Sequence, residues 1–281
     1  MIDCETEISE GRRFAFGQNW LRFGQLINEE RVALARKSLE SALRTTDLTG
    51  RTFLDVGCGS GLFSLAALRM GARVQSFDYD PDSVKAAEEV RREFAPDSDW
   101  SISRGSILDA SFVKELGPAD IVYSWGVLHH TGALWGAMEA ACGLVAPGGT
   151  LYVSIYNDQG AESRLWTSVK RRYNMSGTVG RRLLLTGSRL YLYKHYPVRA
   201  ALEVARQIRG TSSGPVRRAR GMSRRHDLVD WVGGYPFEVA TPEEVFTFCR
   251  ERGFELRHLK TCKGGLGCNE FVFAHAPAVT A

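Results

Sequence analysis

The sequence contains no long apolar run. Its hydrophobic stretches all fall well short of the roughly 20 residues that a helix needs to cross a bilayer. Residues 1–7 are acidic and lack the basic-then-apolar order of a signal peptide. These two absences lead us to expect a cytoplasmic protein rather than a membrane-spanning or secreted one.

Cysteine is scarce, with 6 residues in a chain of 281, and its spacing is irregular. A disulfide scaffold is therefore not indicated, and we expect reduced thiols. Cys262 and Cys268 are the one pair that suggests a metal site, but no histidine at a matching spacing accompanies them, so we expect no metal. The net charge of +4 is too small to favour nucleic acid or an anionic membrane as a partner.

A glycine-rich stretch at residues 53–61 is the most informative feature that is present. It begins with a short apolar run ending in Asp55 and Val56, which is typical of a buried parallel strand. Gly57, Gly59 and Gly61 follow, and then a helical pattern of apolar residues. Strand, glycine turn and helix open many nucleotide-binding α/β domains. The spacing G-x-G-x-G differs from the G-x-G-x-x-G of dinucleotide sites.

A second acid, Asp78, ends the next predicted strand and can accept hydrogen bonds from ribose hydroxyls. Two acids beside a tight glycine loop suit a phosphate poorly, because like charges repel. They suit a ligand that combines an adenosine with an ammonium and a sulfonium group.

On these residues the chain resembles the class I S-adenosylmethionine-dependent methyltransferases, over roughly residues 50–157 and 241–276. The resemblance implies S-adenosylmethionine as the methyl donor and S-adenosylhomocysteine as the product. It also implies that the glycine loop lies against the methionyl part and that Asp78 holds the ribose. Tyr79 belongs to the same donor contacts.

The rest of the chain divides into four parts. We expect an N-terminal helical lid segment at 1–50, an S-adenosylmethionine-binding Rossmann-like core at 51–157, a basic helical insertion at 158–240 that covers the substrate, and the last part of the core sheet at 241–281. Aromatic residues at 14–23 are either the core face of a helix or part of a lid over the donor. Gly210–Pro215 is expected to be a flexible break in the insertion.

Regular alternation of strands and helices from 51 to 157 predicts an α/β fold with a parallel sheet. By the resemblance, the strand order is 3-2-1-4-5-7-6 and the last strand is antiparallel. We expect strands near 52–56, 73–77, 100–104, 120–124, 149–156, 254–260 and 270–275, and helices near 61–70, 82–95, 109–116, 133–145 and 242–252.

Ligands of open α/β sheets bind beyond the carboxyl ends of the strands, which selects further candidates. Ser106 and Ile107, after the third strand, are expected to flank the adenine. The family often has an acid where Ser106 stands, so the adenine amine is held by this side chain, by backbone or by Asp109. Trp125, after the fourth strand, is expected to line the passage between donor and acceptor.

The segment after the fourth strand lacks the Asn/Asp-Pro-Pro-Tyr run of enzymes that methylate nucleobase amines, and the chain lacks a Pro-Cys nucleophile. It carries instead His129 and His130, which resemble the histidines of small-molecule methyltransferases related to the ubiquinone and menaquinone enzymes. Methyl transfer is an in-line displacement, so the protein has to align the acceptor and remove its proton. His130 is the first candidate for that base and His129 the second, unless one merely caps the following helix.

Candidates for contact with the acceptor come from three further loops: Tyr156 and Asn157 after the fifth strand, Tyr235 before the sixth, and Asn269 between the sixth and seventh. The sequence thus predicts methyl transfer to a hydroxyl of a small metabolite. An N-methyltransferase, a tRNA-modifying enzyme of the wobble-uridine type and a non-catalytic donor-binding protein remain alternatives. The basic insertion is a solvated face, a peripheral membrane contact or, less favoured, a nucleic-acid contact.

Overall fold

The computed structural model describes residues 3–193 and 224–276. Seven strands form one sheet in the order β3-β2-β1-β4-β5-β7-β6, and β7 is antiparallel to β5 and to β6. This confirms the predicted sheet. The strands are β1 Thr52–Val56, β2 Arg73–Asp78, β3 Trp100–Arg104, β4 Ala119–Trp125, β5 Val145–Tyr156, β6 Phe254–Lys260 and β7 Cys268–His275.

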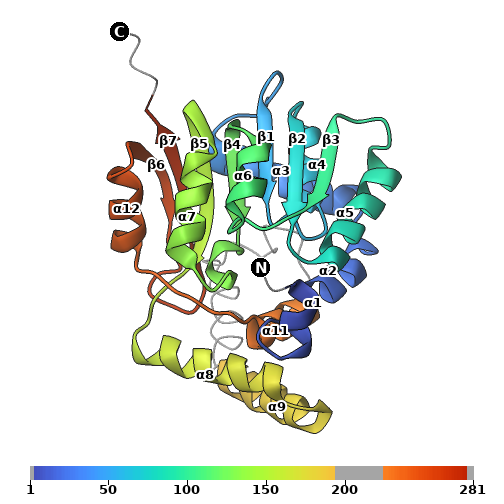
Figure 1. Ribbon diagram of the computed structural model, residues 1–281, viewed down its shortest axis with the longest axis vertical. Coiled ribbons are helices and arrows are strands. Elements are labelled where there is room, and N and C mark those ends of the chain that lie inside the picture. The colour runs from blue at the N-terminus through green and yellow to red at the C-terminus, as the bar shows by residue number, and fades with distance from the viewer. Residues whose placement is uncertain (1–2, 194–223, 277–281) are drawn as a thin grey trace, which may run out of the picture.

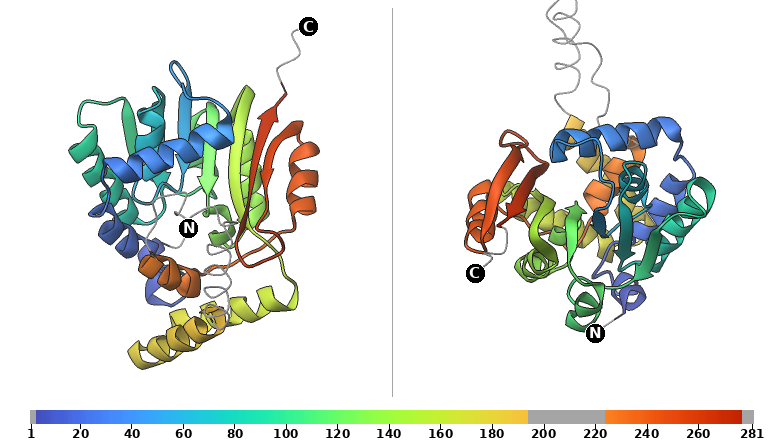
Figure 2. Two further views of the ribbon diagram at one scale, coloured as in Figure 1. Left: turned by 180° about the vertical axis from the view of Figure 1, so that it is seen from behind. Right: turned by 90° about the horizontal axis from the view of Figure 1, so that it is seen from above.

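Helices cover both faces of the sheet, and a further group of helices lies beyond one end of its strands, as Figures 1 and 2 show. They are α1 Cys4–Ser9, α2 Phe16–Gly24, α3 Glu29–Leu43, α4 Leu62–Leu68, α5 Pro81–Phe94, α6 Ala110–Leu116, the short 3₁₀ helix η1 Leu128–His130, α7 Leu134–Gly143, α8 Ala161–Met175, α9 Thr178–Tyr193, α11 Arg224–Gly233 and α12 Pro242–Arg250. None of the helices in the described ranges is long and apolar enough to cross a membrane.

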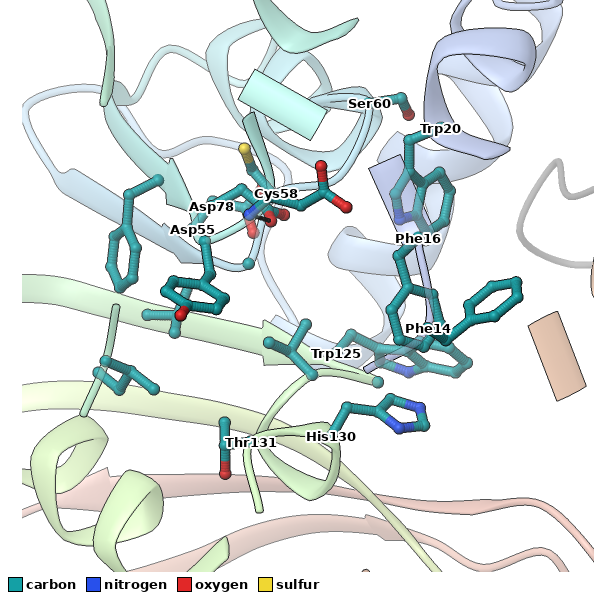
Figure 3. A pocket seen from close by; sticks show the side chains of 18 of the residues that line it. Phe14, Phe16, Trp20, Asp55, Cys58, Ser60, Asp78, Trp125, His130 and Thr131 are labelled. Carbon is teal, nitrogen blue, oxygen red and sulfur yellow. Dashed lines mark hydrogen bonds between the residues drawn. The ribbon is translucent and has the colours of Figure 1, made fainter. Parts of the chain in front are cut away.

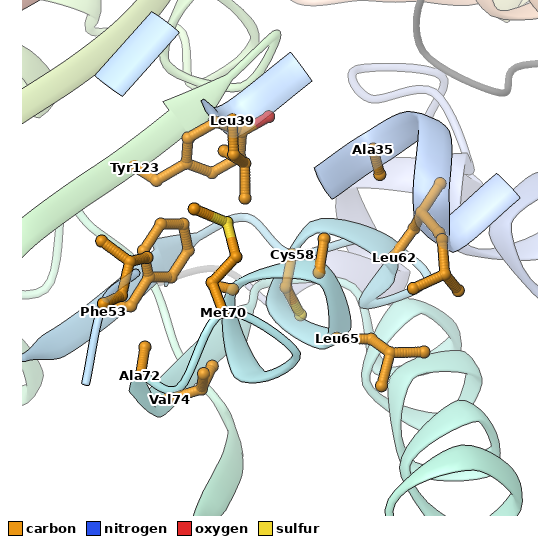
Figure 4. Packing of buried hydrophobic residues seen from close by; sticks show 14 of the residues in the cluster. Ala35, Leu39, Phe53, Cys58, Leu62, Leu65, Met70, Ala72, Val74 and Tyr123 are labelled. Atoms are coloured by element: carbon orange, nitrogen blue, oxygen red, sulfur yellow. The ribbon is translucent and has the colours of Figure 1, made fainter. Parts of the chain in front are cut away.

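Alternation along the strands separates two cores. Phe53 and its neighbours on one face pack with α3, α4 and α5, as Figure 4 shows for part of this cluster. Leu54 points to the other face and packs with residues of α6, α7 and α12. Burial of both faces is what a parallel sheet requires.

One strand differs from the sequence expectation at its start. Strand β5 begins at Val145 rather than near 149, and its pairing with β4 shifts between Ala119 and Ile121. A Pro-Gly-Gly turn at 147–149 lies inside this irregularity, where Gly148 has a φ of 75°. The turn therefore interrupts the strand without ending it.

The insertion after β5 forms its own small cluster beyond the carboxyl ends of the parallel strands (Figure 1). Its two ends meet: Ala240 N donates to Tyr156 O at 3.0 Å, and Asp158 N donates to Ala240 O at 3.2 Å. Helices α8, α9 and α11 thus leave the sheet and return to it at one point. The predicted break at Gly210–Pro215 lies outside the described residues.

Candidate active site

The glycine loop between β1 and α4 is pinned to the end of β2. Gly57 N and Cys58 N both donate to Phe77 O, at 2.9 and 3.1 Å. Gly57 has a φ of 77°, and a Cβ there would lie 2.3 Å from Cγ1 of Val127. Only glycine fits this position, so the loop takes one tight path beside the strand ends.

Asp78 lies at the end of β2 with its carboxylate against this loop. Oδ2 accepts a hydrogen bond from Gly59 N and Oδ1 accepts one from Asp80 N, both at 2.9 Å. Burial raises the pKa of Asp78 to about 6, although the two backbone N–H donors counteract the shift.

Asp55, at the end of β1, is buried and accepts a hydrogen bond from Ser64 Oγ at 2.6 Å. Burial is the main cause that raises the pKa of Asp55 to about 7, and the charge of Asp78 adds to it. Near neutral pH Asp55 is therefore partly protonated and Asp78 mostly ionised, and a nearby cation would favour the ionised form of both.

Both acids open into a cavity of about 830 Å³ at the carboxyl ends of the strands. In Figure 3, Asp55 and Asp78 lie together at one end, and Phe14, Trp125 and His130 gather at the other. We call these ends the donor half and the acceptor half. The donor half includes four further predicted residues that line the cavity, Gly57, Tyr79, Ser106 and Ile107, and Trp125 lines the cavity as well. Gly59 and Gly61 shape the loop without lining the cavity.

Helix α2 covers the glycine loop. The Trp20 ring lies so close to Gly59 that a Cβ there would be 2.9 Å from Cε2 of the ring. The helix is held by Asp80, whose Oδ2 accepts a hydrogen bond from Gly17 N at 2.8 Å in the first turn of α2. The aromatic residues of the N-terminal segment therefore form a wall of the cavity and are more than a core face.

Arg13 is a site residue that sequence reasoning missed. It lines the cavity, with Nε donating to Glu7 Oε2 at 2.6 Å and Nη1 donating to His130 O at 3.0 Å. Its guanidinium also lies 4.9 Å from the centre of the Tyr79 ring. The only signal in the sequence is the pair Arg12-Arg13, which resembles ordinary surface charge.

At the predicted adenine side, Ser106 Oγ accepts a hydrogen bond from Leu108 N at 3.2 Å. Asp109 does not line the cavity. Its carboxylate instead accepts from Ser111 N at 3.0 Å and from Phe112 N at 3.3 Å, which caps α6. Of the three alternatives for the adenine amine, the structure thus brings only Ser106 and the backbone to the cavity.

The structure brings His130 to the cavity and fixes its protonated nitrogen. Nδ1 lies 2.6 Å from Pro236 O, and a carbonyl can only accept. Nδ1 therefore carries the proton and Nε2 carries a lone pair. Burial lowers the pKa of His130 to about 3, so the ring is neutral at physiological pH.

His129 is fully buried and does not line the cavity. Its Nδ1 accepts a hydrogen bond from Tyr156 N at 3.3 Å, and its ring packs 4.1 Å from the Tyr156 ring. Burial lowers its pKa well below the ordinary value. Of the two candidate bases, His130 is the one within reach of a ligand in the cavity.

The four residues predicted to contact the acceptor also differ in whether they line the cavity. Tyr156 lines the cavity, whereas Asn157, Tyr235 and Asn269 do not. Asn269 Nδ2 donates to Asn157 Oδ1 at 2.9 Å, and Asn269 Oδ1 accepts from Cys262 N at 3.0 Å. These two residues tie the β6–β7 loop to the end of β5.

The β6–β7 loop itself supplies Leu266 and Gly267 to the cavity wall, the start of β7 supplies Cys268, and α11 supplies Trp231. The contribution of Tyr235 is its backbone carbonyl, which accepts from Phe14 N at 2.9 Å. The structure therefore uses the predicted loops but, except at Tyr156, different residues within them.

Comparison with known proteins decides the family. The family described as a methyltransferase domain matches residues 27–184, more than half of the chain. The chain belongs to this methyltransferase family. Its membership agrees with the donor predicted from the glycine loop, S-adenosylmethionine, and with a transferase activity.

Curated relatives include a ubiquinone biosynthesis O-methyltransferase of Xanthomonas campestris pv. campestris, 36% identical over 110 residues, which are 39% of this chain and 45% of that protein. Another, of Xylella fastidiosa, is 31% identical over 125 residues, covering 44% and 50% of the two chains. The chain thus spans about half the length of the curated relatives it matches.

Solved structures share the fold of this chain. The [4+2]-cyclase SpnF has a TM-score of 0.52 at 13% identity, with 88% of this chain and 81% of that chain covered. The magnesium protoporphyrin IX methyltransferase of Synechocystis PCC 6803, with bound SAM, has a TM-score of 0.50 at 12% identity, with 93% and 84% covered. At this level of identity the likeness establishes the fold alone.

Proposed function

We propose that this protein transfers a methyl group from S-adenosylmethionine to an acidic hydroxyl of a small, flat, apolar molecule. The observation that carries the proposal is a single cavity that joins the glycine loop and Asp78 to the free Nε2 side of His130. Donor and acceptor held there would react in one enclosed space, which favours an in-line displacement.

The donor half fits the charges of S-adenosylmethionine. Asp78 lines the cavity, and its two oxygens each retain a lone pair for ribose hydroxyls beyond the bonds they accept from backbone. A cationic ligand would favour the ionised forms of Asp55 and Asp78, whose pKa values burial raises to about 7 and 6. The donor supplies a methyl group on a positively charged sulfur.

In the acceptor half, His130 would accept the hydroxyl proton at Nε2 while Nδ1 stays bonded to Pro236 O. With a pKa of about 3, the buried ring is a weak base. Proton transfer to a weak base is most favourable from an acidic hydroxyl, so a phenol or enol fits better than an aliphatic alcohol. The rings of Phe16, Tyr156 and Trp231 form walls that suit a planar acceptor.

Methyl transfer to an oxygen is also the reaction for which the curated relatives are named, since they are O-methyltransferases. A tRNA acceptor has one supporting feature, the exposed Arg171, Arg172 and Arg182 on α8 and α9. Leu183 and Leu190 are equally exposed on α9, at 69% and 70%. These exposed leucines lie among the exposed arginines. A surface that mixes apolar and cationic side chains suits the phosphate backbone of a nucleic acid less well than it suits a lipid surface.

The proposal is tested by incubating the protein with S-adenosylmethionine and a panel of phenols, each paired with the saturated alcohol of the same carbon skeleton. S-adenosylhomocysteine release, followed by mass spectrometry, should occur with phenols. In His130→Asn the side-chain amide still donates toward Pro236 O but Nε2 is gone, and kcat should fall about 100-fold.

Binding of S-adenosylhomocysteine to His130→Asn should equal that of the wild type, because His130 lies in the acceptor half. His258→Gln on the edge strand β6 is the matched control and should keep full turnover. Turnover with saturated alcohols alone, or undiminished turnover in His130→Asn, would contradict the proposal.

A further inference from the structure

Lys170 of α8 is the one lysine or arginine among the described residues whose side chain is buried, with no exposed surface at all. Withdrawing an ammonium group from water costs several kcal/mol unless polar or aromatic partners compensate. Its surroundings therefore show what the charge does in the fold.

The ammonium group of Lys170 lies among three aromatic rings and donates to a backbone carbonyl. Nζ lies 4.4 Å from the centre of the Trp231 ring, 4.5 Å from that of Phe237 and 5.8 Å from that of Tyr156. Nζ also donates a hydrogen bond to Trp231 O. Two of these rings, Tyr156 and Trp231, also line the cavity.

The carbonyl that Lys170 binds belongs to the last turn of α11. One helical turn along α8, Asn174 Nδ2 donates to Gly233 O at 2.7 Å, and to Lys170 O at 2.9 Å. A cation and an amide at a helix C-terminus satisfy carbonyls that lack intrahelical partners. Helix α8 thus fixes the position where α11 ends.

Residues 231–238, which we call the wall segment, run from this anchor to the histidines. Within it, Pro236 O receives the proton of His130 Nδ1 at 2.6 Å, and Glu238 N donates to His129 O at 2.9 Å. The Glu238 carboxylate accepts from Leu134 N at 3.1 Å, at the start of α7. The wall segment is therefore held by α8 at one end and by η1 and α7 at the other.

We propose that Lys170 is a positioning residue of the methyl transfer: its ammonium group fixes the wall segment, and the wall segment fixes the tautomer and orientation of His130. The inference rests on the function proposed above. Lys170 does not line the cavity, so it acts through Trp231 and Pro236 rather than on the acceptor.

The hydrogen bond and the charge of Lys170 have two different effects on His130: the bond holds the segment whose carbonyl fixes the tautomer, and the charge favours the neutral ring. The titratable and charged groups around His130 are Arg13 from the N-terminal segment, His129 from η1, Tyr156 from β5, Glu238 from the wall segment and Lys170 from α8. Beyond burial, the positive charges of Lys170 and Arg13 lower the pKa of His130. A neutral ring with its lone pair at Nε2 is the form a proton acceptor needs.

Nitrogen-15 NMR of histidine side chains tests this without an acceptor, because the ring-nitrogen shifts report tautomer and protonation. Spectra of the full chain would be recorded from pH 5 to 8 for the wild type, Lys170→Met, Lys170→Gln and Arg171→Met. Methionine removes donor and charge, and glutamine keeps an N–H donor without the charge. Arg171 is an exposed cation on the same helix and is the matched control.

We expect wild-type His130 to remain neutral with the proton on Nδ1 throughout this range. In Lys170→Met the tautomers should mix and the pKa of His130 should rise, while burial still holds it below 6.5, with Lys170→Gln keeping more of the Nδ1–H form. Arg171→Met should match the wild type. The affinity for S-adenosylhomocysteine should change less than about twofold in every variant, because Lys170 touches only the acceptor half.

A wild-type His130 that titrates near 6.5, or that carries its proton on Nε2, would overturn the proposal even if no Lys170 variant folds. The proposal also fails if Lys170→Met keeps the wild-type tautomer and titration, or if Arg171→Met changes both as Lys170→Met does. Failure of wild-type protein to bind S-adenosylhomocysteine would instead contradict the proposed function, while the histidine spectra would still decide whether Lys170 positions His130.

Discussion

The two halves of the cavity respond to burial in opposite ways. In the donor half, burial raises the pKa values of Asp55 and Asp78 to about 7 and 6. In the acceptor half, burial lowers the pKa of His130 to about 3. The cause is the same, because a low-dielectric site disfavours whichever form is charged. The donor half is therefore prepared for a cation, and the acceptor half keeps a neutral proton acceptor.

The halves also differ in how the chain builds them. Most of the donor half comes from one stretch, β1 through the end of β2, with a further contribution from 105–107. The acceptor half joins the N-terminal segment, η1, the end of β5, α11 and the β6–β7 loop. Local sequence specifies the first, whereas long-range packing specifies the second.

The largest effect is expected from a substitution in the glycine loop, which tests how strictly local sequence specifies the donor half. In Gly59→Ala the φ of 55° is strained for alanine, and the Cβ would meet the Trp20 ring at 2.9 Å. We expect the affinity for S-adenosylhomocysteine to fall about 100-fold, measured by isothermal titration. Gly50→Ala has a similar φ of 78° with nothing within 4 Å of the added carbon, so it isolates the strain from the contact. Equal affinities in the two variants would show that the contact with Trp20 does not matter.

A second substitution tests whether the contacts that hold the acceptor half can be removed without weakening donor binding. Asn269 is buried and joins Asn157 to the backbone of Cys262. Asn269→Ala leaves these groups without partners and should lower the free energy of unfolding by about 2 kcal/mol in urea titrations. Donor affinity should stay within about twofold. A variant as stable as the wild type would mean that the β6–β7 loop is held by other contacts.

Donor affinity should depend on pH through the two acids. A cationic ligand prefers ionised Asp78, and protonation below its pKa of about 6 removes that preference. We therefore expect S-adenosylmethionine to bind about tenfold more weakly at pH 5 than at pH 8, with proton release on binding near pH 6.5. Titrations in buffers of different ionisation enthalpy measure both quantities. Asp78→Asn should remove most of the pH dependence, and an unchanged profile in that variant would place the titrating group elsewhere.

The smallest expected effect is on the free energy of unfolding. The titratable groups of the two halves change it with pH in opposite directions. His129 and His130 have lowered folded-state pKa values, so their contribution is present above 6.5 and is lost as the pH falls. Asp55 and Asp78 have raised values, so their contribution is present below 3.8 and is lost as the pH rises through 6 and 7. Between pH 4 and 6.5 the two partly cancel.

Urea unfolding at several pH values would separate these contributions. Asp78→Asn should make stability fall more steeply on acidification, by about 1 kcal/mol, and His130→Asn should make it fall less. The same slope in both variants as in the wild type would show that the two halves do not differ in this respect.

The α/β sheet could be predicted from the sequence, and most of the predicted donor residues line the cavity. Alternating strands and helices predicted a parallel sheet, the family resemblance supplied its strand order, and Asp55, Gly57 and Asp78 lie at or just after the ends of their strands. The position of His130 beside the cavity followed from the end of β4 in the same way.

Sequence reasoning was weaker where contacts span the chain. Asn157 and Asn269 are polar residues at loop ends, yet they bond to each other instead of facing a ligand. Arg13 and Lys170 are ordinary charges in the sequence, and only the packing of α8 and the N-terminal segment gives them partners in the site. No local pattern encodes contacts of that range.

The central claim is that Asp78 and the glycine loop hold S-adenosylmethionine. Isothermal titration of S-adenosylmethionine and S-adenosylhomocysteine into the wild type, Asp78→Ala and the exposed control Asp97→Ala tests it most directly. We predict micromolar binding of both ligands by the wild type and by Asp97→Ala, and loss of binding in folded Asp78→Ala. Undiminished binding by Asp78→Ala, or no binding by the wild type, would contradict the account.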